Sequence, residues 1–394
     1  MRKLECSLVV ALLLICAGFP LLQAGYEIFV DHEKPFLLNF FTQKPGKENW
    51  HRWDENAKDR SVFSKWLRPK TLQLRYDLFK EMAPKAIAGV DDWLFYNQDV
   101  DYLIDPTYSE NRFYKGSFDT LISNKRVNIR NPFIAIEHFR DELKAQNIQL
   151  LIVPIPGKPS IYPEKLVRGF NSSPDSPTLT FIDDLKKSGF NVVDLFTPII
   201  NAKKTTAESN YFYLKHDTHW TPQGLEIAAT VISEKISSLL LSADKKVSAA
   251  ETDHYFLKDT TIMRYGDIAE MTKVPNRKKI WAEEKVFAAQ VYNTRDSLLY
   301  KDDSTSTILW LGDSFSRIYQ TDAPKSAGLI AHLAYHLNQP ITSIVNDCGA
   351  STVVRQQLAR RPNLLKGKKL VVWSFVERDI RFGSKGWQVE SLSP

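Results

Sequence analysis

From about residue 131 onward, short runs of apolar residues alternate with longer stretches in which apolar residues recur at helical spacing. The apolar runs are predicted strands, at 150–153, 191–196, 307–311, 341–345 and 370–375. Helices are predicted at 134–145, 178–187, 221–241, 315–337 (interrupted at Pro324) and 352–361. Strands that are apolar on both faces are typical of a parallel sheet covered by helices on both sides. The sequence therefore predicts an α/β fold with three layers, α/β/α, and a mostly parallel central sheet.

Several regions depart from this alternation. Residues 25–84 are rich in charged and aromatic residues, and short helices are predicted near 50–53 and 60–76. The segment 89–96 is predicted to be a turn followed by an aromatic strand, in a hairpin that closes the core. Residues 245–300 carry many charges and no clear period, so we expect an insertion whose loops line a site. The predicted organisation is a targeting segment at 1–24, an extension at 25–84 and a main domain at 85–394.

The N-terminal segment has the three parts of a secretory signal. A basic start, Met1-Arg2-Lys3, precedes an apolar run at 6–22, and Gln23-Ala24-Gly25 offers a cleavage site. Leu22 is large for its place two residues before Ala24, so an uncleaved membrane anchor is the alternative. In either case the positive end stays inside and the body of the protein is expected to be exported.

Composition excludes several classes of protein. The chain is 43% hydrophobic and 25% charged and has only 3 Cys, which excludes a disordered chain and a disulfide scaffold. A net charge of +6 is compatible with an acidic partner but lacks the concentrated basic face of a nucleic-acid binder. Loss of residues 1–24 would remove two positive charges and one negative charge, giving +5, and would leave Cys348 as the sole cysteine. No internal disulfide is therefore expected.

A serine stands where an apolar strand is predicted to turn into a helix. Ser314 follows Ile308 to Gly312 and Asp313, which places its hydroxyl at the carboxyl end of a parallel strand, where ligands bind in open α/β sheets. A nearby helix N-terminus would place backbone N–H groups where they can stabilise an oxyanion. The alternative is an ordinary turn in which Asp313 caps the following helix.

A serine needs a base, and the segment 211–220 offers one. Asp217 and His219 are two residues apart, so in an extended loop their side chains leave the same side of the backbone. Asp217 would then orient His219, which would take the proton of Ser314, as in a Ser-His-Asp triad. His219 as an ordinary packed histidine is one alternative. A metal site formed by His216, Asp217 and His219 is the other, but no further cluster completes it, so no metal or cofactor is expected.

These motifs resemble a known family. Gly312-Asp313-Ser314-Phe315 resembles the serine block of SGNH (GDSL-type) esterases and acetyltransferases. Asp217-Thr218-His219-Trp220 resembles the Asp-His block of their permuted relatives, the alginate O-acetylation proteins of the AlgJ/AlgX type, in which this block precedes the serine. Supporting matches occur at 89–95, 153–158, 162–163 and 372–375, and little chain after Phe375 remains for a carbohydrate-binding module, which favours the AlgJ side.

The resemblance implies an SGNH hydrolase-like fold with circularly permuted motif order. It also implies a periplasmic O-acetyltransferase, tethered to the inner membrane if its N-terminal segment is uncleaved. The enzyme would acetylate mannuronate hydroxyls of alginate, or another exported polysaccharide, through an acetyl-serine. Acetyl groups would come from a membrane-bound partner of the MBOAT class within a polysaccharide-secretion complex. Two alternatives stay open, an esterase that removes acetyl groups from a glycan and a non-catalytic polysaccharide-binding subunit.

SGNH enzymes ordinarily stabilise the oxyanion with donors from separate Gly and Asn blocks. The backbone N–H of Ser314 and either Asn346 or Gly349, after the predicted strand 341–345, are the candidates here. An ordinary turn at the end of that strand is the alternative for Asn346 and Gly349. Lys158 and Arg317 are candidates for contact with uronate carboxylates, although solvation at the surface explains most Lys and Arg side chains.

Overall fold

The computed structural model describes residue 10 and residues 18–38, 46–104, 119–122, 125–128, 131–170, 176–207, 210–243, 254–382 and 386–392. Most of the predicted targeting segment lies outside these residues. The chain divides into two compact units, Met1–Ala83 with Lys273–Arg277, and Pro84–Thr272 with Lys278–Pro394. The division between Ala83 and Pro84 lies next to the boundary expected after residue 84. The role of residues 1–24 as a targeting segment stays a prediction.

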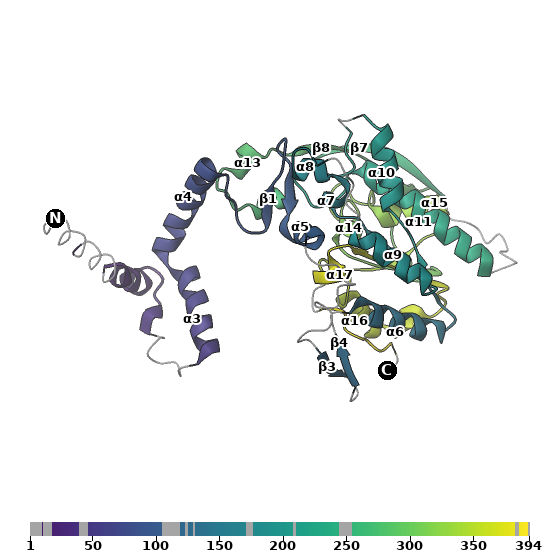
Figure 1. Ribbon diagram of the computed structural model, residues 1–394, viewed down its shortest axis with the longest axis horizontal. Coiled ribbons are helices and arrows are strands. Elements are labelled where there is room, and N and C mark those ends of the chain that lie inside the picture. Colours follow the sequence, from purple (N-terminus) through teal and green to yellow (C-terminus); the bar gives the residue numbers. More distant parts are fainter. Residues whose placement is uncertain are drawn as a thin grey trace. The chain divides into compact units, whose positions relative to one another are not determined.

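The helices and strands are labelled in Figure 1. In chain order they are η1 (Phe36–Leu38), α3 (Lys47–Arg60), α4 (Val62–Phe79), β1 (Ala86–Ala88), β2 (Leu94–Tyr96), α5 (Asn97–Ile104), β3 (Asp119–Ile122), β4 (Lys125–Asn128), α6 (Pro132–Lys144), β5 (Gln149–Ile155), α7 (Lys158–Ile161), α8 (Pro163–Leu166), α9 (Pro177–Lys187), β6 (Asn191–Val192), α10 (Phe196–Thr205), α11 (Pro222–Ala243), β7 (Tyr255–Arg264), α12 (Asp267–Met271), α13 (Arg277–Ile280), β8 (Glu284–Asn293), β9 (Ile308–Gly312), α14 (Ser314–Arg317), α15 (Leu329–Leu337), β10 (Thr342–Val345), α16 (Val353–Ala359), η2 (Pro362–Leu365), β11 (Leu370–Val376) and α17 (Asp379–Phe382).

The second unit is built on one five-stranded sheet with strand order β10-β9-β11-β5-β6. All four neighbouring pairs of strands are parallel. The central strands β9 and β11 are buried at every position, because helices cover both faces of the sheet. The predicted α/β class and parallel sheet are therefore confirmed.

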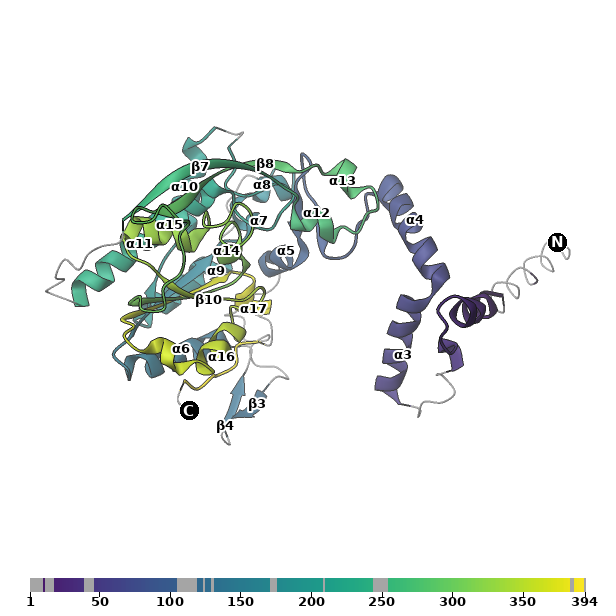
Figure 2. The ribbon, with the colours of Figure 1, turned by 180° about the vertical axis from the view of Figure 1, so that it is seen from behind.

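Two separate apolar clusters lie on the two faces of this sheet. Along β5, Leu151 and Val153 belong to one cluster and Leu150 and Ile152 to the other, as the alternation of side chains along a strand requires. The first cluster includes residues of α10, α11 and α15, and the second includes residues of α6, α9 and α16. In Figure 2, α6 and α16 lie on one side of β10, and α11 and α15 lie on the other.

Two predicted elements are wrong in extent. The strand predicted at 191–196 ends at Val192, and α10 begins at Phe196, where the Asp194 carboxylate accepts the backbone N–H of Phe196 at 2.8 Å. The helix predicted at 315–337 breaks into α14 and α15. Tyr319, Lys325 and Ser326 between these helices have left-handed φ angles of 61°, 73° and 49°, which no helix accommodates.

The predicted insertion contains a long antiparallel ribbon. Strands β7 and β8 pair along their full length, from Tyr255 opposite Asn293 to Arg264 opposite Glu284. Figure 1 shows the two strands running side by side. The ribbon was not predicted, because β7 is exposed at most positions and lacks an apolar run. The predicted hairpin near residue 89 is confirmed by the antiparallel pairing of β1 and β2.

The first unit is helical. The helices expected near residues 50 and 60 are confirmed as α3 and α4, but at 14 and 18 residues they are not short. The Ser61 side chain accepts the backbone N–H of Ser64 at the start of α4. Residues 18–29 are also helical. Among the described residues, no helix combines the length and the apolar character that crossing a bilayer requires.

Candidate active site

Ser314 lies two residues beyond Gly312, the last residue of the central strand β9, at the first position of the short helix α14. Asp313 precedes it as the helix cap, and its carboxylate accepts the backbone N–H groups of Phe315 at 2.9 Å and Val376 at 3.1 Å. Gly312 permits the turn, because a Cβ there would collide with the Ser316 and Ser374 hydroxyls. Asp313 is therefore a cap, as its alternative interpretation held, and it fixes the serine between β9 and β11.

Asp217 and His219 lie in a tight loop before α11. An antiparallel bridge between Tyr213 and Trp220 closes this loop. Its turn brings both side chains to one side, where the Asp217 carboxylate accepts the His219 backbone N–H at 3.1 Å and lies 2.6 Å from Nδ1. The loop thus holds the imidazole at two points before it meets the serine.

The three side chains form a continuous hydrogen-bonded chain. His219 Nε2 lies 2.8 Å from Ser314 Oγ. Because Nδ1 faces a carboxylate, a neutral ring carries its proton there and leaves Nε2 to accept the serine proton. The His219 ring packs on Phe315, with ring centroids 4.8 Å apart. The structure thus brings together the three residues that the sequence pairs as a triad.

Burial and charge act against each other in this chain. Burial alone would raise the pKa of Asp217, but His219 and the Arg264 guanidinium hold it well below its usual range. Burial alone would lower the pKa of His219, but the Asp217 carboxylate more than offsets this, so that the net shift is upward. The arrangement favours an ionised Asp217 beside a basic imidazole, which are the roles of a triad.

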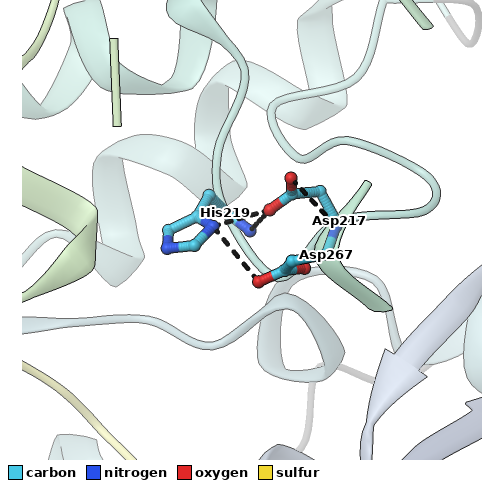
Figure 3. A group of neighbouring side chains, drawn as sticks. All are labelled: Asp217, His219 and Asp267. Atoms are coloured by element: carbon cyan, nitrogen blue, oxygen red, sulfur yellow. Dashed lines mark hydrogen bonds and ion pairs between the residues drawn. The ribbon is translucent and has the colours of Figure 1, made fainter. Parts of the chain in front are cut away.

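Two further charged residues reach the triad from the ribbon and the helix after it. Arg264 ends β7 and its Nε lies 2.9 Å from Asp217 Oδ2. Asp267 begins α12, and its Oδ2 lies 3.6 Å from His219 Nδ1 (Figure 3). Sequence reasoning named neither residue. The only indication of these two residues in the sequence was the expectation that loops of the segment 245–300 line a site.

The alternative of a metal site involving His216 does not fit the geometry. His216 Nε2 lies 3.0 Å from the Asp92 carboxylate, away from His219. Among the described residues, the group close enough to hold an ion is instead Asp217, His219 and Asp267. Both ring nitrogens of His219 already have partners, and Arg264 supplies positive charge at Asp217. This donor set suits a triad better than a metal centre.

The prediction that Lys158 contacts substrate is wrong. Its side chain is fully buried, and Nζ donates to the backbone carbonyls of Leu214, Lys215 and Asp217 at 3.0, 3.1 and 2.7 Å. Burial lowers the pKa of Lys158 to about 8 despite the carboxylates nearby. Lys158 therefore stabilises the loop that carries Asp217 and His219 from the protein interior, and its ammonium group cannot reach a sugar.

The oxyanion candidates have separate outcomes. The prediction that Gly349 donates to the oxyanion is wrong, because its N–H donates to the Asn346 carbonyl at 3.0 Å in an ordinary turn after β10. The Asn346 side chain is half-buried, one residue beyond Val345, which pairs with Gly312. The Ser314 N–H stands at a helix start, where an N–H has no acceptor in its own helix. Both Asn346 and Ser314 stay predictions as oxyanion donors.

Arg317 lies in α14, one turn beyond Ser314, and is half-buried. Its Nε donates to the Asp347 carboxylate at 2.8 Å, and it also pairs with Asp322. Contact between Arg317 and a uronate carboxylate stays a prediction. Such a contact would compete with the carboxylates of Asp347 and Asp322.

A further buried carboxylate, Glu377, lies just beyond the carboxyl end of β11. Glu377 accepts hydrogen bonds from the Gly157 N–H at 2.7 Å, the Thr178 hydroxyl at 2.7 Å and the Ser160 hydroxyl. Burial raises the pKa of Glu377 to about 7, because these neutral donors offset only part of the cost of its charge. It therefore ties α7 and α9 to the end of β11.

Comparisons with known proteins give consistent results. Residues 86–377 match the family described as SGNH hydrolase-like domain, acetyltransferase AlgX. A probable alginate O-acetylase AlgJ of Pseudomonas fluorescens is 24% identical over 314 residues, covering 77% of this chain and 71% of the relative. The O-acetyltransferase domain of Pseudomonas putida AlgJ is 20% identical with a TM-score of 0.57, covering 76% of this chain and 93% of that one. Pseudomonas aeruginosa AlgX is 17% identical with a TM-score of 0.50, covering 74% and 61%.

Proposed function

Because this chain belongs to the SGNH hydrolase-like acetyltransferase AlgX family, we propose that it transfers acetyl groups through Ser314 to hydroxyl groups of an exported polysaccharide, mannuronate residues of alginate foremost. The observation that carries the proposal is the chain of contacts from Asp217 through His219 to Ser314, at 2.6 and 2.8 Å. The AlgJ names of relatives supply the polymer.

In the first half-reaction, Ser314 Oγ attacks the carbonyl carbon of an acetyl donor while His219 Nε2 takes the hydroxyl proton. The Asp217 carboxylate stabilises the imidazolium that forms. The oxyanion accepts hydrogen bonds from the Ser314 N–H and the Asn346 amide. Collapse of this intermediate breaks the bond to the leaving group, which departs with the proton from His219, and acetyl-Ser314 remains.

In the second half-reaction, a sugar hydroxyl attacks acetyl-Ser314 and gives its proton to His219 Nε2. The bond between the acetyl carbon and Ser314 Oγ then breaks, and the proton returns to Oγ. The polymer gains one acetyl ester, and the enzyme returns to its starting state. If water instead of a sugar reached the acetyl group, the same residues would perform ester hydrolysis.

The site's location in the cell is part of the proposal. We propose that the domain lies in the periplasm, tethered to the inner membrane if the N-terminal segment is uncleaved, and that a membrane-bound MBOAT-class protein of a secretion complex supplies acetyl groups. The apolar run at 6–22 behind Arg2 and Lys3 supports export. Membrane fractionation and N-terminal sequencing test the tether, and co-purification of an MBOAT-class protein tests the partner.

The direct test of the nucleophile is a short pulse with an acetyl ester followed by peptide mass spectrometry. One acetyl group on Ser314 is expected in the wild type, and none in Ser314→Ala or His219→Ala. Ser316→Ala is the matched control, because this buried serine bonds Trp310 and not His219, and it should still acquire the acetyl group on Ser314. Wild-type protein that binds polymer but acquires no acetyl group with any ester would support a non-catalytic binding subunit instead.

A further inference from the structure

The charges around His219 are more numerous than a three-residue triad requires. Two carboxylates, Asp217 and Asp267, face Nδ1, at 2.6 and 3.6 Å. One guanidinium, Arg264, lies against the outer oxygen of Asp217. Arg264 and Asp267 are separated by two residues, and both contact the triad. A single short segment therefore places one positive and one negative charge beside Asp217 and His219.

This segment is fastened closely to the triad loop. The backbone N–H groups of Ile268 and Ala269 both donate to the His216 carbonyl at 3.1 Å. Gly266 is needed between the two charged residues, because a Cβ there would collide with the His216 carbonyl. The Asp267 carboxylate accepts the Thr218 N–H and hydroxyl, each at 2.7 Å. Contacts with Thr218 therefore fix the position of the Asp267 carboxylate, and the bond to the Asp217 carboxylate fixes that of the Arg264 guanidinium.

The signs of these charges matter for a general base. Two carboxylates beside one imidazole would stabilise the imidazolium strongly, and a protonated His219 cannot accept the serine proton. Arg264 cancels one of the two negative charges. Burial and the neighbouring Asp217 raise the pKa of Asp267, so Asp267 is the more weakly ionised of the two carboxylates, while it still gives the loop the hydrogen bonds to Thr218.

We infer that Arg264 and Asp267 act as a compensating pair of positioning residues that sets the basicity of His219, with Asp267 raising it and Arg264 restraining it. The inference rests on the proposed function, in which His219 is the base. Arg264 is mostly buried, so its charge acts on Asp217 with little screening by solvent.

Other charged groups surround this site and stay constant in the tests. Asp313 after β9 and Lys158 in α7 interact with the triad charges. Asp322 lies 3.5 Å from the Arg264 guanidinium, and the Glu284 carboxylate accepts the backbone N–H groups of Lys215 and His216. Variants at Arg264 and Asp267 leave all of these side chains in place, and in Arg264→Gln the Asp322 carboxylate keeps its pairing with Arg317.

The test is the pH profile of Ser314 acetylation by an acetyl ester in Asp267→Asn, Arg264→Gln and the double variant. The acid limb of this profile reports the pKa of His219. Asp267→Asn should move the limb to lower pH by about one unit and Arg264→Gln should move it to higher pH by about one unit. The double variant should return close to the wild-type position. Asp259→Asn, an exposed carboxylate on β7, is the matched control and should not move the limb.

Shifts of both single variants in the same direction, or a double variant that does not return, would overturn the inference. Arg264→Lys keeps the charge and should keep the wild-type limb, which separates the charge from a loss of folding. A parallel NMR titration of the His219 ring in the same variants needs no catalysis. Absence of acetyl-Ser314 in the wild type would contradict the proposed function. An unchanged titration of the His219 ring in the variants would contradict only the role inferred for Arg264 and Asp267.

Discussion

Asp217 and Glu377 are both fully buried carboxylates near the carboxyl edge of the same sheet, yet their pKa values move in opposite directions. Asp217 has an imidazole at one oxygen and a guanidinium at the other. Glu377 has only hydroxyl groups and a backbone N–H. The difference shows that burial alone does not decide the charge of a carboxylate. Positively charged partners lower the pKa of Asp217 and keep it ionised for catalysis. Neutral donors leave the pKa of Glu377 raised, and this side chain instead links α7 and α9 to the end of β11.

The sharpest test of this contrast replaces each carboxylate by its amide. Asp217→Asn should lower the rate of Ser314 acetylation by about 10⁴-fold, because the amide no longer stabilises the imidazolium and favours the wrong tautomer of His219. Glu377→Gln, an equally buried control, should stay within a few-fold of the wild type. Acetylation kinetics measure both, and comparable losses in the two variants would remove the distinction.

The loop under Asp217 is the next test. Lys158→Met leaves three buried carbonyl groups without their donor, which should lower the free energy of unfolding by about 3 kcal/mol and slow acetylation through misplacement of Asp217. Lys203→Met is the control, since this partly exposed lysine bonds Ile161 and Glu164 instead. Denaturant unfolding measures the effect, and equal costs for the two variants would deny Lys158 its special role.

Glu377 predicts a pH dependence of stability. Its pKa is raised in the folded state to about 7 from 4.5, so its stabilising contribution is fully present below about pH 4.5 and is lost as pH rises through about 7. Glu377→Gln is permanently neutral and should escape that loss. The unfolding free energy of the wild type should therefore fall relative to the variant by up to about 3 kcal/mol between pH 4 and pH 8. A difference that stays constant over this range would contradict the raised pKa.

The smallest effect is expected at Arg317, whose charge is shared with Asp347 and Asp322. Arg317→Ala should raise KM for an anionic polymer several-fold with little change in kcat, and high salt should reduce the difference. Initial rates with a uronate polymer and a neutral glucan acceptor provide the measurement. An equal change for both acceptors would show that Arg317 does not recognise carboxylates.

The parallel sheet could be predicted because strands buried on both faces are continuous apolar runs, as at 150–153 and 370–375. The triad could be predicted because Asp217 and His219 are close in sequence and Ser314 follows such a strand. The ribbon of β7 and β8 could not, because β7 is exposed at most of its positions. Arg264 and Asp267 could not, because their contacts with Asp217 span 47 and 50 residues.

Lys158 shows a different limit of sequence reasoning. A lysine is ordinarily exposed, and the sequence around it does not reveal that three carbonyl groups of a distant loop would surround its ammonium group. Gly349 shows the same limit on a smaller scale, since a glycine after a strand looks the same whether its N–H closes a turn or meets a substrate. Both outcomes depend on tertiary contacts.

In the proposed function, Ser314 carries an acetyl group on its way to a polymer hydroxyl. The most direct measurement is a chase, in which acetyl-Ser314 protein, freed of donor, is mixed with deacetylated polymannuronate or with buffer alone. Mass spectrometry then follows the adduct on Ser314, and NMR follows acetyl esters on the polymer. We expect the polymer to accelerate loss of the adduct and to gain the acetyl groups. Release of free acetate at the same rate with and without polymer would contradict it.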